Sequence, residues 1–283
     1  QRAGRGQTGA GSMQADYLNQ YMEHVGSNGL MLSPEQRAAL QISLEIAKKN
    51  YKFNQIYFWG KIIGLNADYF VVQGVETDEL KGRKSLYSLN CMDWKLLPPA
   101  TDEMIERSMH VKGRFLGDPS REYDPITVKT GEEEADLELR VKEEERLTAT
   151  IEQINREAAI IPRGAFVKTP LEQIHKNRSF EGLSVTEAGK LQSYLHFTMP
   201  LKLKLKSMLS QANLEESIDF LSSLEDDDLK VFWSLQYEKG SKLVILRSLL
   251  WIGFTFFHVP ETSQHGHIYL GMGERNIDFP FMI

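Results

Sequence analysis

The sequence predicts an α+β protein built mainly on antiparallel sheet, with one N-terminal helix and further helices in the middle of the chain. Aromatic and β-branched runs gather near both ends of the chain, in residues 55–97 and 231–270. Segments with helix caps and helical apolar spacing lie before and between these runs. Strands at both ends with helices between them favour one body closed by its terminal strand runs. The alternative is a pair of domains divided in the acidic residues 131–146.

The N-terminal helix has the clearest local signals. Ser33 is suited to the N-cap, Pro34 to the first helical position, and Gln36 to the reciprocal bond of a capping box. Apolar positions follow at spacings of four, three and four residues: Leu40, Leu44, Ala47 and Tyr51. This spacing predicts a helix that ends near residues 48–50 and packs one stripe on a sheet.

The first sheet-rich segment predicts a β-hairpin, with strands at residues 56–59 and 69–72 flanking a turn at 65–68. Gly60 and Gly64 indicate a bulge or a close backbone approach, because they interrupt or follow a run of large side chains. Residues 84–97 form a third predicted strand, closed by Pro98 and Pro99. Thr101 then opens a short polar helix that ends at about His110.

The middle of the chain gives mixed signals. Residues 151–158 keep helical spacing, whereas residues 159–164 read as a strand ending in a turn. A capping box at Ser184 predicts a second helix running to about His196. Leucine and lysine alternate in residues 201–206, which favours a charged edge strand, and residues 214–224 are compatible with a helix. The C-terminal strands are expected at residues 231–237, 243–257 and 268–270.

The expected layout has three parts. Residues 1–12 form a disordered or non-native extension, residues 13–52 an N-terminal helical segment, and residues 53–283 an α+β body with a flexible acidic insertion near 118–146. Residues 131–146 hold eight acidic and three basic residues, a local net charge of −5. Because no EF-hand ligand spacing is present, we interpret this stretch as a solvated loop or exposed strand face.

Composition narrows the function classes. The 283 residues include 41% hydrophobic and 25% charged residues with a net charge of −6, so neither nucleic acid nor an anionic membrane is an expected partner. The longest apolar run, residues 243–257, contains Arg247 and is shorter than the roughly 20 residues of a membrane helix. Cys91 is the single cysteine, which excludes an intramolecular disulfide and indicates a reducing compartment. We expect a buried, inert thiol.

No catalytic, cofactor-binding or metal-ligating residue is predicted. Gly271-Met272-Gly273 begins like a phosphate loop, but Asn276 stands in place of the third glycine. His258, His265 and His267 offer three nitrogens to a metal, yet the HExxH spacing is absent and histidines in exposed loops are a commoner explanation. A metal- or nucleotide-dependent enzyme that uses these histidines or glycines is kept as the alternative, together with a general cytosolic adaptor.

Several separated blocks of sequence point to one family. They are FWGKIIG at residues 58–64 with ADYF at 67–70, KSLYSLNC at 84–91, Trp94 with LLPPAT at 96–101, KGRF at 112–115 with GDP at 117–119, AIIPRGA at 159–165, FEGLS at 180–184, LRSLLW at 246–251 and DFPFM at 278–282. In this order they resemble the radial spoke head protein nine family of motile cilia and flagella. The resemblance runs from about Met13 to Ile283.

The resemblance implies a structural, non-catalytic subunit with no cofactor, in the head of the T-shaped radial spoke. The implied location is the cytoskeleton of a cilium or flagellum, the axoneme, within the cytoplasm. The implied partners are radial spoke head proteins four and six, the MORN-repeat head proteins and spoke scaffold protein three. The head meets the central-pair projections, and the spoke passes this mechanical signal to the dyneins of the outer doublets.

Six aromatic residues are the candidate anchors of the core or of an interface, because large buried aromatic side chains dominate the energetics of both. They are Tyr57, Trp59, Tyr69, Trp94, Trp233 and Trp251. Each of them fills either its own sheet or a contact with a partner. The core is the favoured place for each of them, because a large aromatic side chain in a strand run usually fills its own sheet.

Overall fold

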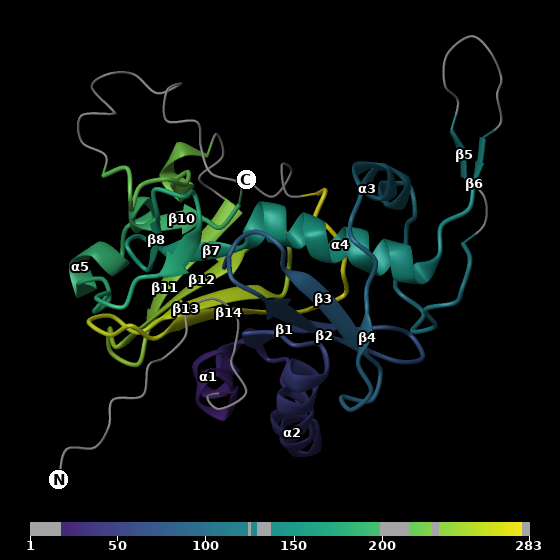
Figure 1. Cartoon of the computed structure of the whole chain (residues 1–283), viewed down its shortest axis with the longest axis horizontal. Coiled ribbons are helices and arrows are strands. Elements are labelled where there is room, and N and C mark those ends of the chain that lie inside the picture. Colours follow the sequence, from purple (N-terminus) through teal and green to yellow (C-terminus); the bar gives the residue numbers. More distant parts are fainter. Residues whose placement is uncertain (1–17, 124–125, 129–136, 199–214, 228–231, 279–283) are drawn as a thin grey trace.

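The computed structural model describes residues 18–123, 126–128, 137–198, 215–227 and 232–278 (Figure 1). Its centre is an eight-stranded sheet of order β11-β12-β13-β14-β1-β2-β3-β4. The strands are β1 Gln55–Ile62, β2 Tyr69–Val75, β3 Lys84–Ser88, β4 Lys95–Leu96, β11 Trp233–Glu238, β12 Leu243–Ser248, β13 Phe254–His258 and β14 His265–Gly271. All neighbours are antiparallel except β1 and β14, which are parallel. The predicted α+β fold is therefore confirmed, and the two terminal strand runs meet at the β1–β14 pair.

Gly60 makes that central junction possible. The register between β1 and β2 shifts between Phe58 and Gly60, so the predicted bulge is confirmed. A Cβ atom at position 60 would lie 2.1 Å from the carbonyl oxygen of Tyr269 on β14. Only glycine permits this approach, because any side chain would collide with the backbone of the parallel strand.

Two helices cover one face of the sheet, α1 Leu18–His24 and α2 Pro34–Asn50 (Figure 1). The short 3-10 turn η2 Gly26–Asn28 lies between them in sequence. The predicted capping box of α2 is present, with the Ser33 hydroxyl accepting from the Gln36 backbone and the Gln36 side chain accepting from the Ser33 backbone. Leu40, Leu44 and Ala47 are buried against the sheet, and each leucine contributes about 2 kcal/mol through burial.

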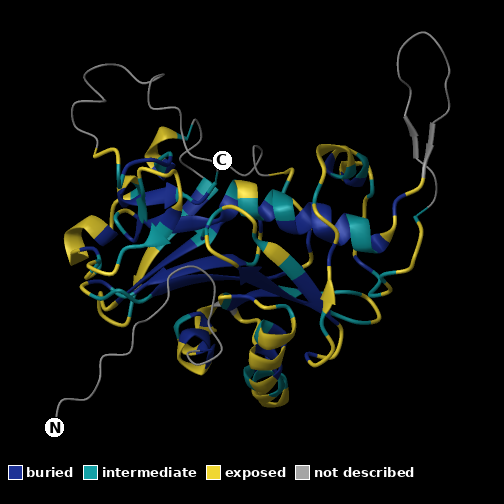
Figure 2. Cartoon of the chain, in the orientation of Figure 1, coloured by how far each residue is buried: buried dark blue, intermediate teal, exposed yellow. Residues whose placement is uncertain are grey.

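A third helix, α4 Glu143–Ala158, lies across the opposite face of the sheet (Figures 1 and 2). Its buried residues include Leu147, Ile151 and Ile154, whose spacing of four and three matches the predicted helical period. Helix α3 Asp102–Met109, capped by Thr101 as predicted, packs on α4. The sheet is thus buried on both faces, with separate apolar clusters under α1–α2 and under α4.

The remaining strands of the described residues form three two-stranded sheets. They pair β7 Ile160–Pro162 with β10 Tyr194–His196, β8 Phe166–Lys168 with β9 Ile174–Lys176, and β5 Ile126–Val128 with β6 Leu137–Leu139. The short elements α5 Val185–Ala188, η3 Leu191–Ser193 and η5 Leu224–Asp226 connect this part of the chain. β5 and β6 project away from the main body (Figure 1).

Several predicted elements differ from the observed ones. The helix expected to continue to His196 ends at Ala188, because Tyr194 begins β10 and pairs there with Pro162 of β7. The Tyr194 hydroxyl also donates a 2.8 Å hydrogen bond to the Ala188 carbonyl. The expected strand at 84–97 is two strands, β3 and β4, and the one at 243–257 is β12 and β13, separated by a turn that includes Gly253 at φ 105°. Residues 215–223 form turns and bends instead of a helix. The lysine-rich alternation at 201–206 lies outside the described residues.

Candidate assembly surface and the contacts that support it

Five of the six candidate anchors lie in the core. Tyr57, Trp59 and Tyr69 have no exposed area, and Trp251 and Trp233 are 2% and 8% exposed. Trp94 is the half-buried exception, and its carbonyl accepts a 2.9 Å hydrogen bond from Tyr51 at the end of α2. In the folded chain the five buried side chains are therefore not available to a partner.

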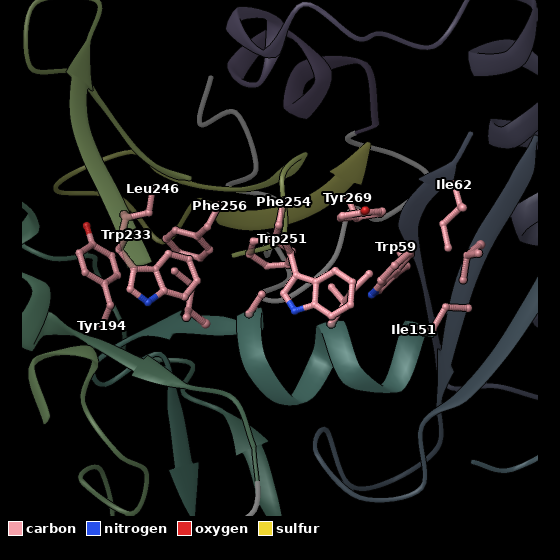
Figure 3. Packing of buried hydrophobic residues seen from close by; sticks show 14 of the residues in the cluster. Trp59, Ile62, Ile151, Tyr194, Trp233, Leu246, Trp251, Phe254, Phe256 and Tyr269 are labelled. Carbon is pink, nitrogen blue, oxygen red and sulfur yellow. The ribbon is translucent and has the colours of Figure 1, made fainter. Parts of the chain in front are cut away.

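Two of these tryptophans join α4 to the sheet (Figure 3). The Trp59 indole N–H donates 2.8 Å to Asn155, and the Trp251 indole N–H donates 2.8 Å to Glu157. Both acceptors are in the last turn of α4. A buried indole N–H needs such a partner, so the two bonds fix how α4 lies on the sheet.

Glu143, the first residue of α4, forms a buried cluster that we call the Glu143 clasp. Its side chain has no exposed area and accepts five hydrogen bonds. Tyr69 and the Gly117 and Asp118 amides donate to Oε1 over 2.7, 2.7 and 3.1 Å, and Tyr123 and the Leu116 amide donate to Oε2 over 2.7 and 3.0 Å. Burial alone would raise the Glu143 pKa, but these hydrogen bonds outweigh it and hold the pKa below its ordinary value.

Arg146, on the same turn of α4, completes the clasp. Its guanidinium lies over the rings of Phe115 and Tyr123, at 4.3 and 5.2 Å from their centroids. It also donates to the Tyr123 hydroxyl over 2.9 Å and to the Gly113 carbonyl. The charge of Glu143 is thus compensated by oriented donors and by a neighbouring cation.

The prediction that the acidic stretch 131–146 is a solvated loop or exposed strand face is wrong for its last four residues. Residues 143–146 begin α4, and Glu143 and Arg146 are buried. The clasp also fixes the root of the β5–β6 arm, because Tyr123 bonds to the Val141 carbonyl and Glu143 bonds to the Arg121 carbonyl through their backbones. The sequence does hold a signal for the start of α4 that sequence reasoning missed. Three glutamates follow Lys142 directly, and acidic side chains in the first turn of a helix are stabilised by the helix dipole.

The three C-terminal histidines lie on the central strands β13 and β14 and are 0–1% exposed, so the explanation that they lie in exposed loops is wrong. His258 joins two segments, with Nδ1 3.0 Å from the Gln264 carbonyl and Nε2 accepting 3.2 Å from the Leu183 amide. Burial lowers the pKa of His258 to about 4 and that of His267 to about 3. Burial and the nearby His258 lower the pKa of His265 well below its ordinary value.

The other candidate motifs also have structural roles. Gly271 ends β14, and the Gly273 amide donates 2.9 Å to the Tyr269 hydroxyl, which leaves that amide unavailable to a phosphate. Cys91 is buried, and burial raises its thiol pKa to about 12. Within the described residues, no three histidine, cysteine, aspartate or glutamate side chains converge as metal ligands. In the same part of the chain, each helix is too short or too polar to cross a membrane.

Two groups of exposed apolar side chains among the described residues bear on assembly. The first is the outer face of α2, with Ile42 and Ile46. The second, which we call the strand-end patch, consists of Leu65, Ile252, Met272 and Ile277, each 45–70% exposed. Its loops adjoin, because the Ile63 amide bonds to the Gly271 carbonyl and Asn276 bonds to the Leu249 and Leu250 carbonyls.

In the described chain, most of the large aromatic residues are buried, and isoleucines are exposed on a helix face and in loops at strand ends. The sequence profile of radial spokehead-like proteins matches residues 7–186. The chain is 53% identical to the Radial spoke head protein 9 homolog of Danio rerio over 96% of its own length and 100% of that protein. The corresponding identities are 51% for the homolog of Homo sapiens and 50% for that of Xenopus tropicalis, with the same coverage. The chain belongs to the radial spokehead-like protein family.

Proposed function

We propose that this chain is a non-catalytic structural subunit of the radial spoke head in the axoneme of a motile cilium or flagellum. The observation that carries the proposal is the identity of 50–53% with radial spoke head protein 9 homologs, which extends over the full length of those proteins. Similarity that reaches every element of the fold supports a shared place in the same assembly more strongly than a shared fold alone.

The mechanical part of the proposal is transmission of force between the central pair and the dyneins of the outer doublets. A force-bearing subunit must deform little, and three features support this property here. The sheet is covered on both faces, two indole hydrogen bonds join α4 to it, and the Glu143 clasp ties the loop of residues 113–123 to the start of α4. Densely packed interiors of this kind have low compressibility.

The proposed partners are radial spoke head proteins four and six, the MORN-repeat head proteins and spoke scaffold protein three, with central-pair projections as indirect partners. The strand-end patch is the surface that we propose for one of these contacts. Its four large exposed side chains come from three loops, after β1, after β12 and after β14, and backbone hydrogen bonds join the segments that follow β1 and β12 to the segment that follows β14. Exposed apolar clusters of this type are typical of protein contacts.

The test is replacement of the endogenous relative in motile ciliated cells by the tagged chain. The expected result is a tag in the ciliary shaft, spoke heads visible by cryo-electron tomography, and normal beating. Ile252→Glu combined with Met272→Glu should remove the chain from spokes, whereas Leu171→Glu, at an 81% exposed site on the β8–β9 turn, should not. A tag confined to the cell body while complete spoke heads form would contradict the proposal and favour a general cytosolic adaptor.

A further inference from the structure

Helix α2 has an outer face that its position in the fold does not explain. The helix packs on the sheet through Leu40, Leu44 and Ala47, and nothing in the described chain covers its opposite side (Figure 2). That side carries Ile42 and Ile46, which are 68% and 54% exposed. Two exposed isoleucines one turn apart are an unusual choice for a solvated helix face, where charged residues are expected.

Five exposed residues of this face have spacings that read the same in both directions, and Glu45, which is also exposed, lies at the edge of the face outside this pattern. In order the five are Glu35, Ala38, Ile42, Ile46 and Lys49, with spacings of three, four, four and three residues. All five lie within one stripe, because residues three, four and seven apart share a helix face. Reversing the helix about Ile42 exchanges Ala38 with Ile46 and Glu35 with Lys49. A small residue thus takes the place of a large one, and an acid takes the place of a base.

We propose that this face of α2 packs antiparallel on the α2 of a second copy of the chain, around a two-fold axis at Ile42. Such an interface is self-complementary: if one residue of the first copy contacts another residue of the second copy, the reverse contact is made on the other side of the axis. Ala38 of each copy accommodates Ile46 of the other, which allows the helices to approach to about 8–10 Å. Glu35 and Lys49 are about 21 Å apart along the helix, so they form one ion pair at each end of the contact.

Charge complementarity selects a second copy as the occupant. Within the described part of the chain, neither Glu35 nor Lys49 pairs with an opposite charge of its own molecule. In a parallel arrangement, Glu35 would face Glu35 and Lys49 would face Lys49, which is repulsive. The antiparallel arrangement converts both repulsions into attractions. One helix pair buries less surface than a standard interface, so we expect a dimer that dissociates on dilution.

Sedimentation velocity of the purified chain from about 1 to 200 μM tests the proposal, because this range spans the affinity expected of a small interface. Ile42→Glu should leave a monomer throughout, since it places two carboxylates on the axis. The matched control is Ile252→Glu, at a site of 64% exposure on the strand-end patch, and it should dimerise like the wild type. A wild-type chain that stays monomeric to the highest concentration, or an Ile42→Glu variant that still dimerises, overturns the proposal.

Charge exchange gives the decisive comparison. Glu35→Lys alone and Lys49→Glu alone should each weaken the dimer by about tenfold or more, through two like-charge contacts. An equimolar mixture of these two single variants should associate as a mixed dimer with wild-type affinity, because both ends then pair lysine with glutamate. The double variant in one chain should also recover. An effect on the stability of α2 alone would give a different result: the double variant would be the most impaired, because it places a cation near the N-terminus and an anion near the C-terminus of the helix. Failure of the mixture to associate rejects the antiparallel register.

Ile42→Cys provides a direct measure of the geometry. Under mild oxidation it should give a disulfide-linked dimer, because the two positions meet on the axis, whereas the native Cys91 is buried and Ile252→Cys should remain monomeric. A different result identifies another occupant. If the wild type is monomeric and Ile42→Glu instead abolishes binding to a second spoke-head subunit, the proposal of a second copy fails and the face belongs to that subunit. A monomeric chain that still enters spoke heads would leave the proposed function intact.

Discussion

The buried histidines of β13 and β14 predict that this protein loses stability in mild acid, well above the pH at which carboxylates usually protonate. An imidazole that is neutral in the folded chain and free to charge in the unfolded chain favours unfolding as protons become available. Its contribution to stability is complete above its ordinary pKa of 6.5 and is lost as the pH falls from 6.5 toward the lowered pKa of the folded state. The window for this protein is therefore pH 6.5 down to about 3–4.

The magnitude follows from the two numerical pKa values. At pH 5, unfolded His258 is nearly all charged, while folded His258 with a pKa of about 4 is mostly neutral. The difference is worth about 2 kcal/mol, and His267 with a pKa of about 3 adds about 2 kcal/mol. His265 shifts in the same direction. A loss of about 4 kcal/mol or more is a large part of the 5–15 kcal/mol typical of whole domains.

Urea unfolding followed by tryptophan fluorescence measures this loss between about pH 7.5 and 5. His265→Phe, placed among the rings of Phe180 and Phe256, should reduce the pH dependence by removing one titrating group. The matched control is Phe256→Leu in the same cluster, which should lower the free energy of unfolding equally at every pH. A wild-type free energy that changes by less than about 1 kcal/mol over this range would refute the reasoning.

Three further predictions concern the core and its partners. Glu143→Gln should lower the free energy of unfolding by about 2–4 kcal/mol, because the side-chain NH2 group of the glutamine would face a donor that now bonds to a carboxylate oxygen. The control Glu144→Gln, on the same turn, should lower it by less than about 0.5 kcal/mol. Equal effects of the two variants in urea unfolding would reject the role given to the Glu143 clasp. Trp59→Phe should cost about 2–3 kcal/mol and release the Asn155 bond, and Asn155→Ala in the variant background should then cost little, as a double-mutant cycle measures. Mixing the chain with a subunit of the spoke head protein four type should raise the unfolding temperature of the chain. At a partner concentration one hundred times the dissociation constant, the added stability is about 2.7 kcal/mol. An unchanged unfolding temperature in a thermal scan would count against this partner.

Local sequence signals located most helices and strands correctly. The Ser33 cap and the stripe from Leu40 to Ala47 place α2 within a residue of its observed bounds, because caps and helical spacing depend on neighbours within one turn. The same reasoning failed at the helix expected after Ser184. There the demand that Tyr194 pair with Pro162, a contact across 32 residues, is stronger than local helix propensity.

The candidate site could be predicted only in part. The six aromatic residues were identified from their type, but their division between core and surface was not, since burial depends on what packs against them from elsewhere. Glu143 shows the same limit, because the side chain of Tyr69 and the amides of residues 116–118 reach it from distant positions in the chain. Its surroundings in sequence are acidic and resemble a solvated surface.

By itself the sequence determined the fold class, the capped α2, the strand runs at both ends and the family to which the chain belongs. Only the tertiary structure decided that β1 and β14 meet in parallel, that His258, His265 and His267 are buried, and which apolar side chains stay exposed. The physical reason is range. Hydrogen bonds and side-chain spacing within a few residues specify an element, whereas burial and charge state depend on contacts between residues far apart in the chain, such as His258 and Leu183, which are 75 positions apart.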